Sequence, residues 1–195
     1  MWKSRWLTAA VFLTCLAPAI WLAREWYENR LGVNPIEYVA RYSGRWTLRL
    51  LLITLAITPI RRIVTPLAPI VRFRRMIGLF TFGYGAFHGW HYFARDAQWY
   101  WEIIMEDLTY RRFFVAGAIA LVLMLPLAVT SFDAAVRWLG GARWRLLHRL
   151  VYFSAISAII HFLWQGKGWN PDPVKYGLIL AILLGARFIL WLRKR

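Results

Sequence analysis

The sequence contains only one cysteine, Cys15, and a single thiol cannot form a disulfide within the chain. It also lacks a C-x-x-C-H motif, which excludes a covalently attached c-type haem. Acidic residues are scarce, at nine against 25 Lys and Arg, and the formal net charge is +16. These cations flank apolar runs in small groups, with no basic stripe beside a recognised nucleic-acid reader motif. The charge therefore indicates membrane topology, and no nucleic-acid partner is expected.

Apolar residues are abundant, at 60% of the chain, and the mean hydropathy is positive, which indicates lipid as the solvent. A helix needs roughly 20 residues to cross about 30 Å of hydrocarbon, and a helix pairs its own main-chain groups there. The sequence therefore predicts an all-α, polytopic six-helix bundle that forms one domain over residues 1–195. The expected helices are at about 6–23, 46–60, 76–94, 113–132, 147–165 and 176–192.

Charges bear on the number of spans and on their orientation. Arg49 and Arg187 interrupt the second and sixth runs, so five spans are the alternative to six. With the amino terminus inside, the inner segments hold fourteen Lys and Arg and the outer segments nine, which places both termini in the cytoplasm. The first run, with Ala17-Pro18-Ala19 near its end, also matches a signal peptide. Its 18 residues exceed the usual apolar core of such a peptide, and we expect a span.

Two connections on the outer side contain further signals. Asn34-Pro35 predicts the start of a short helix that ends near Ser43-Gly44. The connection over residues 95–112 is rich in Trp, Tyr and acidic residues, and we expect it on the outer surface. Neither connection is long enough to be an enzyme domain.

The four histidines are the candidate ligands, because an ionisable residue within a membrane span is costly and suggests a function. His88 lies thirteen residues after Arg75, and His161 lies thirteen residues after His148, in runs that both lead outward. His88 and His161 are therefore expected at similar depth in the outer half of the bilayer. Two imidazoles at one depth can ligate one haem iron axially and leave no open position, which suits electron transfer.

Small residues accompany both histidines: Gly83, Gly85 and Gly89 around His88, and Ser154, Ser157 and Ala158 before His161. One interpretation is that they leave room for a flat macrocycle beside the backbone. The other is that they let neighbouring helices pack closely, as a G-x-x-x-G pattern does in membrane bundles. The sequence leaves both interpretations open.

The other two histidines have no matching histidine at their own depth. Thirteen helical residues rise about 20 Å and rotate so that His148 and His161 point about 140° apart, so His148 belongs to an inner site or to the membrane interface. The inner counterpart of His148 on the third run is Arg75, so a second bis-histidine haem is not evident. His91, one turn beyond His88, is a third outer ligand or, as we expect, an interfacial residue.

Two arginines are candidates for binding the anionic groups of a cofactor. Arg49 is placed to pair with a haem propionate or to snorkel to the interface. Arg75 belongs to the inner cluster VRFRR, together with Arg72 and Arg74. That cluster suits a flavin phosphate or anionic lipid headgroups, and membrane lipid is the occupant expected from sequence alone.

Three stretches of the chain resemble the MsrQ (YedZ) family. They are RRMIGLFTFGYGAFH into the third run, RWRLLHRLVYFSAISAIIHFLW through the fifth, and GVNPIEYVARYSGRWTLRLLLITLAITPIRR after the first. The resemblance covers nearly the whole chain, and its most specific parts are the family histidine of the third run and the pair thirteen residues apart. That family is the haem-binding membrane subunit of a bacterial periplasmic methionine-sulfoxide reductase system. It is related to the transmembrane domains of ferric reductases and NADPH oxidases.

The resemblance implies a b-type cytochrome of the bacterial inner membrane, with one or two haem b groups and FMN. Electrons would come from the quinone pool or a cytoplasmic flavin reductase and pass to a periplasmic, molybdopterin-containing catalytic subunit. His88, His148 and His161 inherit the haem-ligand role, whereas His91 has no counterpart in the family pattern. Unlike the oxidases, this chain lacks a soluble NADPH-flavin domain, so an external electron donor is required.

Two other classes of function use the same side chains. In a metal-ion carrier or sensor, His88, His91 and His161 would bind zinc or copper. In a structural anchor for a periplasmic enzyme, the histidines would only satisfy helix contacts. The leading hypothesis is electron transfer, with no substrate chemistry on this chain.

Overall fold

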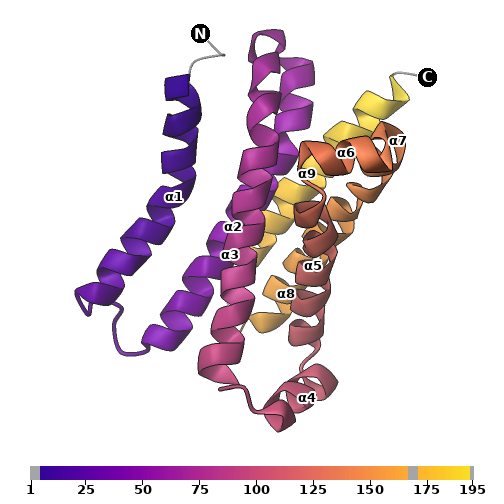
Figure 1. Cartoon of the computed structure of the whole chain (residues 1–195). Helices are drawn as coiled ribbons and strands as arrows, with labels where there is room; N and C mark the ends of the chain where they lie inside the picture. The colour runs from indigo at the N-terminus through magenta and orange to yellow at the C-terminus, as the bar shows by residue number, and fades with distance from the viewer. Residues whose placement is uncertain (1–4, 167–170, 194–195) are drawn as a thin grey trace. The chain divides into compact units, whose positions relative to one another are not determined.

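The computed structural model describes residues 5–166 and 171–193, and the regular elements in these ranges are all helical (Figure 1). In chain order they are α1 (Arg5–Tyr27), α2 (Pro35–Ile63), η1 (Thr65–Phe73), α3 (Arg74–His91), η2 (Tyr92–Asp96), α4 (Trp101–Tyr110), α5 (Arg112–Val129), α6 (Asp133–Leu139), α7 (Gly141–Leu147), α8 (Leu150–Gln165) and α9 (Asp172–Leu192). This confirms the all-α class. Lys3, Lys167, Lys194 and Arg195, which count towards the predicted charge asymmetry, lie outside the described residues.

Each of the six predicted runs coincides with a helix, namely α1, α2, α3, α5, α8 and α9. Among the described residues, four segments are both long and apolar enough to cross a membrane: Arg5–Tyr27, Arg112–Val129, Gly141–Gln165 and Asp172–Leu192. The chain is therefore a helical membrane protein, and the count of six spans stays a prediction. It divides into two compact units, Met1–Gln98 and Trp99–Arg195.

In the first unit, α2 begins as the sequence predicts but does not end there. The Asn34 side chain accepts a hydrogen bond from the Glu37 N–H at 3.1 Å, and Pro35 occupies the first turn. The expected end near Ser43-Gly44 is wrong, because α2 continues to Ile63. The Ser43 hydroxyl donates to the Val39 carbonyl oxygen at 2.7 Å, a bond within the helix.

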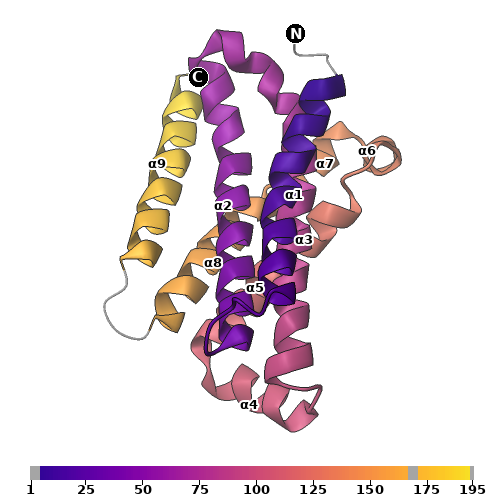
Figure 2. The same cartoon turned by 90° about the vertical axis from the view of Figure 1, so that its left-hand side faces the viewer.

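A tyrosine of α3 repairs the hydrogen bonding of α1 around Pro18. Proline has no N–H and its ring clashes with the preceding turn, which opens the ladder of a helix. The Tyr84 hydroxyl accepts from the Ala19 N–H and donates to the Cys15 carbonyl oxygen, both at 2.9 Å. The hydroxyl thus bridges the Cys15 carbonyl and the Ala19 N–H, which would hydrogen-bond directly to each other in an uninterrupted α-helix. Figure 2 shows α1 running alongside α3.

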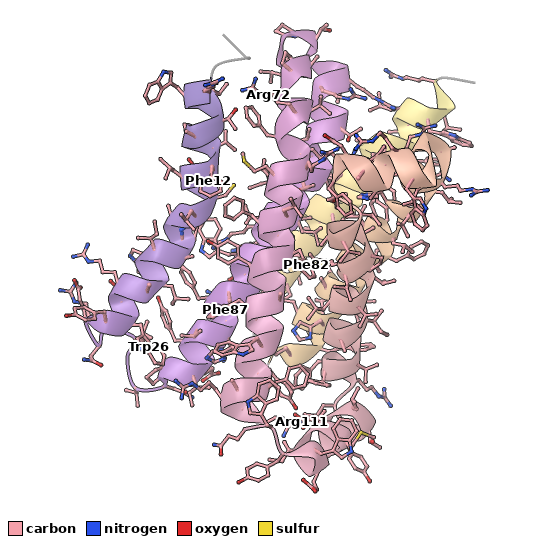
Figure 3. The ribbon with its side chains drawn as sticks, viewed as in Figure 1. Phe12, Trp26, Arg72, Phe82, Phe87 and Arg111 are labelled. Atoms are coloured by element: carbon pink, nitrogen blue, oxygen red, sulfur yellow. The ribbon has the colours of Figure 1, made fainter. Side chains whose placement is uncertain are left out.

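Apolar side chains of α1, α2 and α3 fill the interior of the first unit. The buried members of this core are Cys15, Leu50, Ile57, Phe73, Ile77 and Tyr84. Phe12 of α1, labelled in Figure 3, packs edge-on against Phe80 of α3 with ring centroids 5.1 Å apart. These contacts fix α2 and α3 as the pair that positions His88.

In the second unit, α5 and α8 pack through small residues, and α9 joins α8 through a polar contact. The Arg187 guanidinium donates to the Tyr152 hydroxyl at 2.9 Å and lies 5.3 Å from the centre of that ring. Arg187, the charged residue that interrupts the sixth apolar run, therefore has a hydrogen-bond partner within the protein. The connection expected to be a surface segment contains the helix α4, which the sequence analysis did not predict.

Candidate functional site

α3 places His88 against the main chain of α2. The Nδ1 atom lies 2.9 Å from the Ala40 carbonyl oxygen and 3.4 Å from the Ser43 hydroxyl oxygen. A carbonyl oxygen can only accept, so Nδ1 carries the hydrogen and donates it. In a neutral imidazole this makes Nε2 the nitrogen with the lone pair. The ring also lies over Gly44, where an added Cβ would be 3.2 Å from Cε1 and 3.3 Å from Nδ1.

His161 makes the same contacts within the second unit. Its Nδ1 atom lies 2.7 Å from the Phe113 carbonyl oxygen of α5. Nδ1 therefore donates here too, and Nε2 has the lone pair. The ring lies over Gly117, where an added Cβ would be 2.7 Å from Nδ1.

Two serines extend the contact between α5 and α8 inward from His161. Ser157 donates to the Ala116 carbonyl oxygen at 2.8 Å, and Ser154 donates to the Ala120 carbonyl oxygen at 2.9 Å. Both hydroxyls are therefore used in helix packing. Of the two interpretations of the small residues before His161, the structure supports close packing for these two serines.

An open cleft of about 380 Å³ lies beside the Phe113 end of α5, lined by Tyr110, Arg111, Arg112, Phe113 and Trp164. Arg111, at the corner between α4 and α5 in Figure 3, forms an ion pair with the buried Asp107 at 2.9 Å. Sequence analysis missed these two adjacent arginines as site residues. The available signal was that Arg111 and Arg112 directly precede the fourth apolar run. The first residue of that run, Phe113, accepts the hydrogen bond from His161 through its carbonyl.

His148 lies outside the regular helix and carries the opposite tautomer. α7 ends at Leu147 and α8 begins at Leu150, so the predicted continuous helix from 147 is wrong at its first residues. The ring stacks on Trp144 with centroids 3.8 Å apart, and Nε2 lies 3.2 Å from the Thr130 hydroxyl oxygen. That hydroxyl donates its one hydrogen to the Pro126 carbonyl oxygen at 2.6 Å, so Nε2 is the donor and Nδ1 has the lone pair.

His91 is buried at the end of α3, where its side chain is only 3% exposed. Neither of its ring nitrogens has a hydrogen-bond partner in the structure. The π-helical segment η2 follows directly, and such segments are frequent at functional positions. His91 is therefore a buried imidazole of the first unit, one turn from His88.

The two candidate arginines lie in the first unit. The Arg49 guanidinium is 4.9 Å from the centre of the Trp46 ring, a cation–π distance within α2. Arg75 is exposed in the first turn of α3. Nearby Arg72, labelled in Figure 3, donates to the Thr8 hydroxyl at 3.2 Å. Within VRFRR, Arg72 is therefore hydrogen-bonded to α1, and Arg75 is exposed at the surface.

Within residues 5–166 and 171–193, no three His, Cys, Asp or Glu side chains gather closely enough to hold a metal ion. His88 and His91 belong to the first unit and His161 to the second, so the metal-ion carrier or sensor that would use these three residues stays a hypothesis.

Known proteins are similar to this chain over most of its length. Residues 43–159 match the family described as ferric reductase like transmembrane component. The protein-methionine-sulfoxide reductase heme-binding subunit MsrQ of Azospira oryzae is 45% identical over 184 residues, which cover 94% of this chain and 78% of the relative. The proteins of the same name from Polaromonas naphthalenivorans and Ralstonia nicotianae are 41% and 43% identical, over 91% of this chain and 81% and 82% of theirs. The chain therefore belongs to the MsrQ family of ferric reductase-like transmembrane proteins.

Proposed function

We propose that this chain is the haem-binding, electron-transfer membrane subunit of a methionine-sulfoxide reductase system. The observation that carries the proposal is the shared state of His88 and His161. Each donates through Nδ1 to a main-chain carbonyl, which leaves the Nε2 lone pair of a neutral imidazole for iron. The relatives named as heme-binding MsrQ subunits support haem as the group in question.

The donor set fits haem b. The neutral imidazoles of His88 and His161 would hold the iron through Nε2, and the sequence has no C-x-x-C-H motif for covalent attachment. Haem, when bound, supplies a one-electron carrier. The chain's own groups would do the rest: the Ala40 and Phe113 carbonyls orient the two rings, and the apolar helices exclude water. Arg49 would neutralise a propionate if it turned from Trp46.

The inner part of the proposal assigns His148 to a second site for haem or flavin. Its Nδ1 atom has the lone pair, so His148 would bind a metal through a different ring nitrogen from the Nε2 proposed for His88 and His161. Arg75 would bind the phosphate of FMN, or lipid headgroups, from its exposed position. One or two haem groups and FMN are therefore proposed as cofactors.

The direction of electron flow follows from the proposed topology. Six spans in the bacterial inner membrane, with both termini cytoplasmic, place His88 and His161 in the outer half and His148 in the inner half. Electrons would enter from the quinone pool or a cytoplasmic flavin reductase. They would leave to a periplasmic, molybdopterin-containing subunit that reduces methionine sulfoxide. The excess of inner Lys and Arg, fourteen against nine, supports this orientation.

The test is an optical spectrum of the purified membrane protein, with extraction of its cofactors. We expect a low-spin, bis-histidine b-type spectrum that both His88→Ala and His161→Ala abolish. His91→Ala is the matched control, since it removes the neighbouring imidazole on the same helix. A spectrum unchanged in both His88→Ala and His161→Ala would contradict the ligand assignment.

A further inference from the structure

The two units hold their histidines by the same arrangement of a histidine ring, a main-chain carbonyl and a glycine. In each, the histidine Nδ1–H donates to the carbonyl of one residue on the neighbouring helix, and the ring covers the glycine four residues later. The pairs are Ala40 with Gly44 for His88, and Phe113 with Gly117 for His161. Apart from the glycine, the two sequence segments, ARYSG over residues 40–44 and FFVAG over residues 113–117, share no residue at equivalent positions.

The spacing of four residues has a geometric cause. In an α-helix the carbonyl of one residue accepts from the N–H four residues later, so these two residues lie one above the other. Each Cα–Cβ bond tilts towards the amino-terminal end of the helix. A Cβ at the later residue therefore points at the space beside that carbonyl. A serine hydroxyl is small enough to reach such a carbonyl past a Cβ, but the broad imidazole rings of His88 and His161 occupy the space that a Cβ would need.

We infer that Gly44 and Gly117 are positioning residues that let His88 and His161 reach main-chain carbonyls and so fix Nε2 as the nitrogen that faces iron. The inference about the rings rests on geometry alone, and its extension to iron rests on the proposed function. The two positions differ in degree. An added Cβ would lie 2.7 Å from the His161 ring and 3.2 Å from the His88 ring.

Displacing a ring would change the electronic properties of the ligand. A hydrogen bond from Nδ1 to a carbonyl makes the imidazole a stronger donor, which favours the oxidised metal. Loss of that bond would shift the reduction potential to more positive values. It would also release the ring from the orientation that ligation requires.

The experiment compares Gly117→Ala and Gly44→Ala with two matched helix-interior controls, Gly185→Ala and Gly78→Ala. An added Cβ at Gly185 meets nothing within 4 Å, and at Gly78 it meets only the Thr54 methyl at the ordinary contact distance of 3.8 Å. All four changes favour helix formation, so general unfolding is not expected. We expect haem affinity to fall by about 10- to 100-fold in Gly117→Ala, with a smaller loss in Gly44→Ala and none in the controls. The potential should move positive in the first two variants only.

A readout that does not depend on haem completes the test. The chain has four histidines, so the full protein labelled with ¹⁵N-histidine gives few ring signals, which His→Ala variants assign. In the haem-free protein, His88 and His161 should show a protonated, hydrogen-bonded Nδ1, and Gly117→Ala should remove that signal for His161. A protonated Nε2 at His88 and His161 in the wild type would overturn the inference, whichever variants fold.

The outcomes separate this inference from the proposed function. If His88→Ala and His161→Ala lose haem while Gly44→Ala and Gly117→Ala keep its affinity, potential and ring signals, the glycine inference fails and the function stands. If the histidine variants keep haem, the ligand assignment fails. The ring signals then still decide whether the glycines position the histidines.

Discussion

The α2–α3 pair of the first unit and the α5–α8 pair of the second hold a histidine in the same way but are themselves joined differently. Large side chains fill the first pair, and Leu50, Leu51 and Leu55 are each at most 4% exposed. Small residues line the second pair, where Ser154 and Ala155 are fully buried. One histidine geometry is therefore compatible with two kinds of helix packing.

The polar contacts differ as well. In the second unit the His161 bond is one of three parallel bonds from α8 to carbonyls of α5. In the first unit the His88 bond to α2 is longer, and the Tyr84 hydroxyl of α3 donates to α1. Hydroxyl bonds between the helices therefore accompany the His161 bond in the second unit, whereas large apolar side chains accompany the His88 bond in the first.

The largest loss of stability is expected when α3 of the first unit loses its polar contact with α1. Tyr84→Phe would leave the Cys15 carbonyl and the Ala19 N–H without the bridging hydroxyl beside Pro18. Buried main-chain groups without partners each cost about 1–3 kcal/mol, so we expect the free energy of unfolding to fall by roughly 2 kcal/mol. Denaturation in mixed micelles measures this. Tyr110→Phe, at a side chain 79% exposed, is the control, and an equal small effect in both would contradict the bridge.

A smaller loss of stability is expected when the second unit, like the first, has no hydroxyl bonds beside that of its histidine. Ser154→Ala with Ser157→Ala removes two of the three bonds and leaves His161 as the only one. Interhelical bonds of this kind average about 0.6 kcal/mol in membranes, so the pair should lower the free energy of unfolding by roughly 1 kcal/mol. Ser131→Ala is the matched control, because that hydroxyl makes a local bond to the Leu127 carbonyl at the end of α5. A loss no larger than in this control would show that the serines do not join the helices.

A change in stability of similar size but opposite sign is expected at the residue one turn beyond the histidine of the first unit. In the first unit it is His91, 3% exposed with no partner for either nitrogen, and in the second it is Trp164, 56% exposed. His91→Leu removes an unsatisfied buried imidazole, so the free energy of unfolding should rise by about 1 kcal/mol. The spectrum should not change. A fall in stability, or loss of haem, would show instead that His91 has a partner in the assembled protein.

Hydrophobic runs predicted where the main helices lie, because a helix in lipid needs a long apolar stretch whatever its neighbours are. The start of α2 was also predictable, since the Asn34 cap and Pro35 act within one turn. Its end was not. Ser43-Gly44 is a common stop signal, but the same glycine is tolerated inside a helix where a ring from another helix must approach closely.

The candidate site was likewise predictable only in part. His88, His148 and His161 were identifiable because ionisable residues are rare in apolar runs. The hydrogen-bond partners were not, because Ala40 and Phe113 take part through main-chain carbonyls, which every residue has. The opposite tautomer of His148 was equally hidden. It depends on the Thr130 hydroxyl being already committed to Pro126.

The sequence by itself determined the helical class, the membrane setting and the identity of the histidines, since each follows from side-chain chemistry and local spacing. Only the tertiary structure decided which carbonyl each ring meets, and therefore which nitrogen of each ring has the lone pair. The physical reason is that a tautomer is set by the hydrogen bonds around the ring. Those bonds come from helices that lie 48 residues away for His88 and for His161.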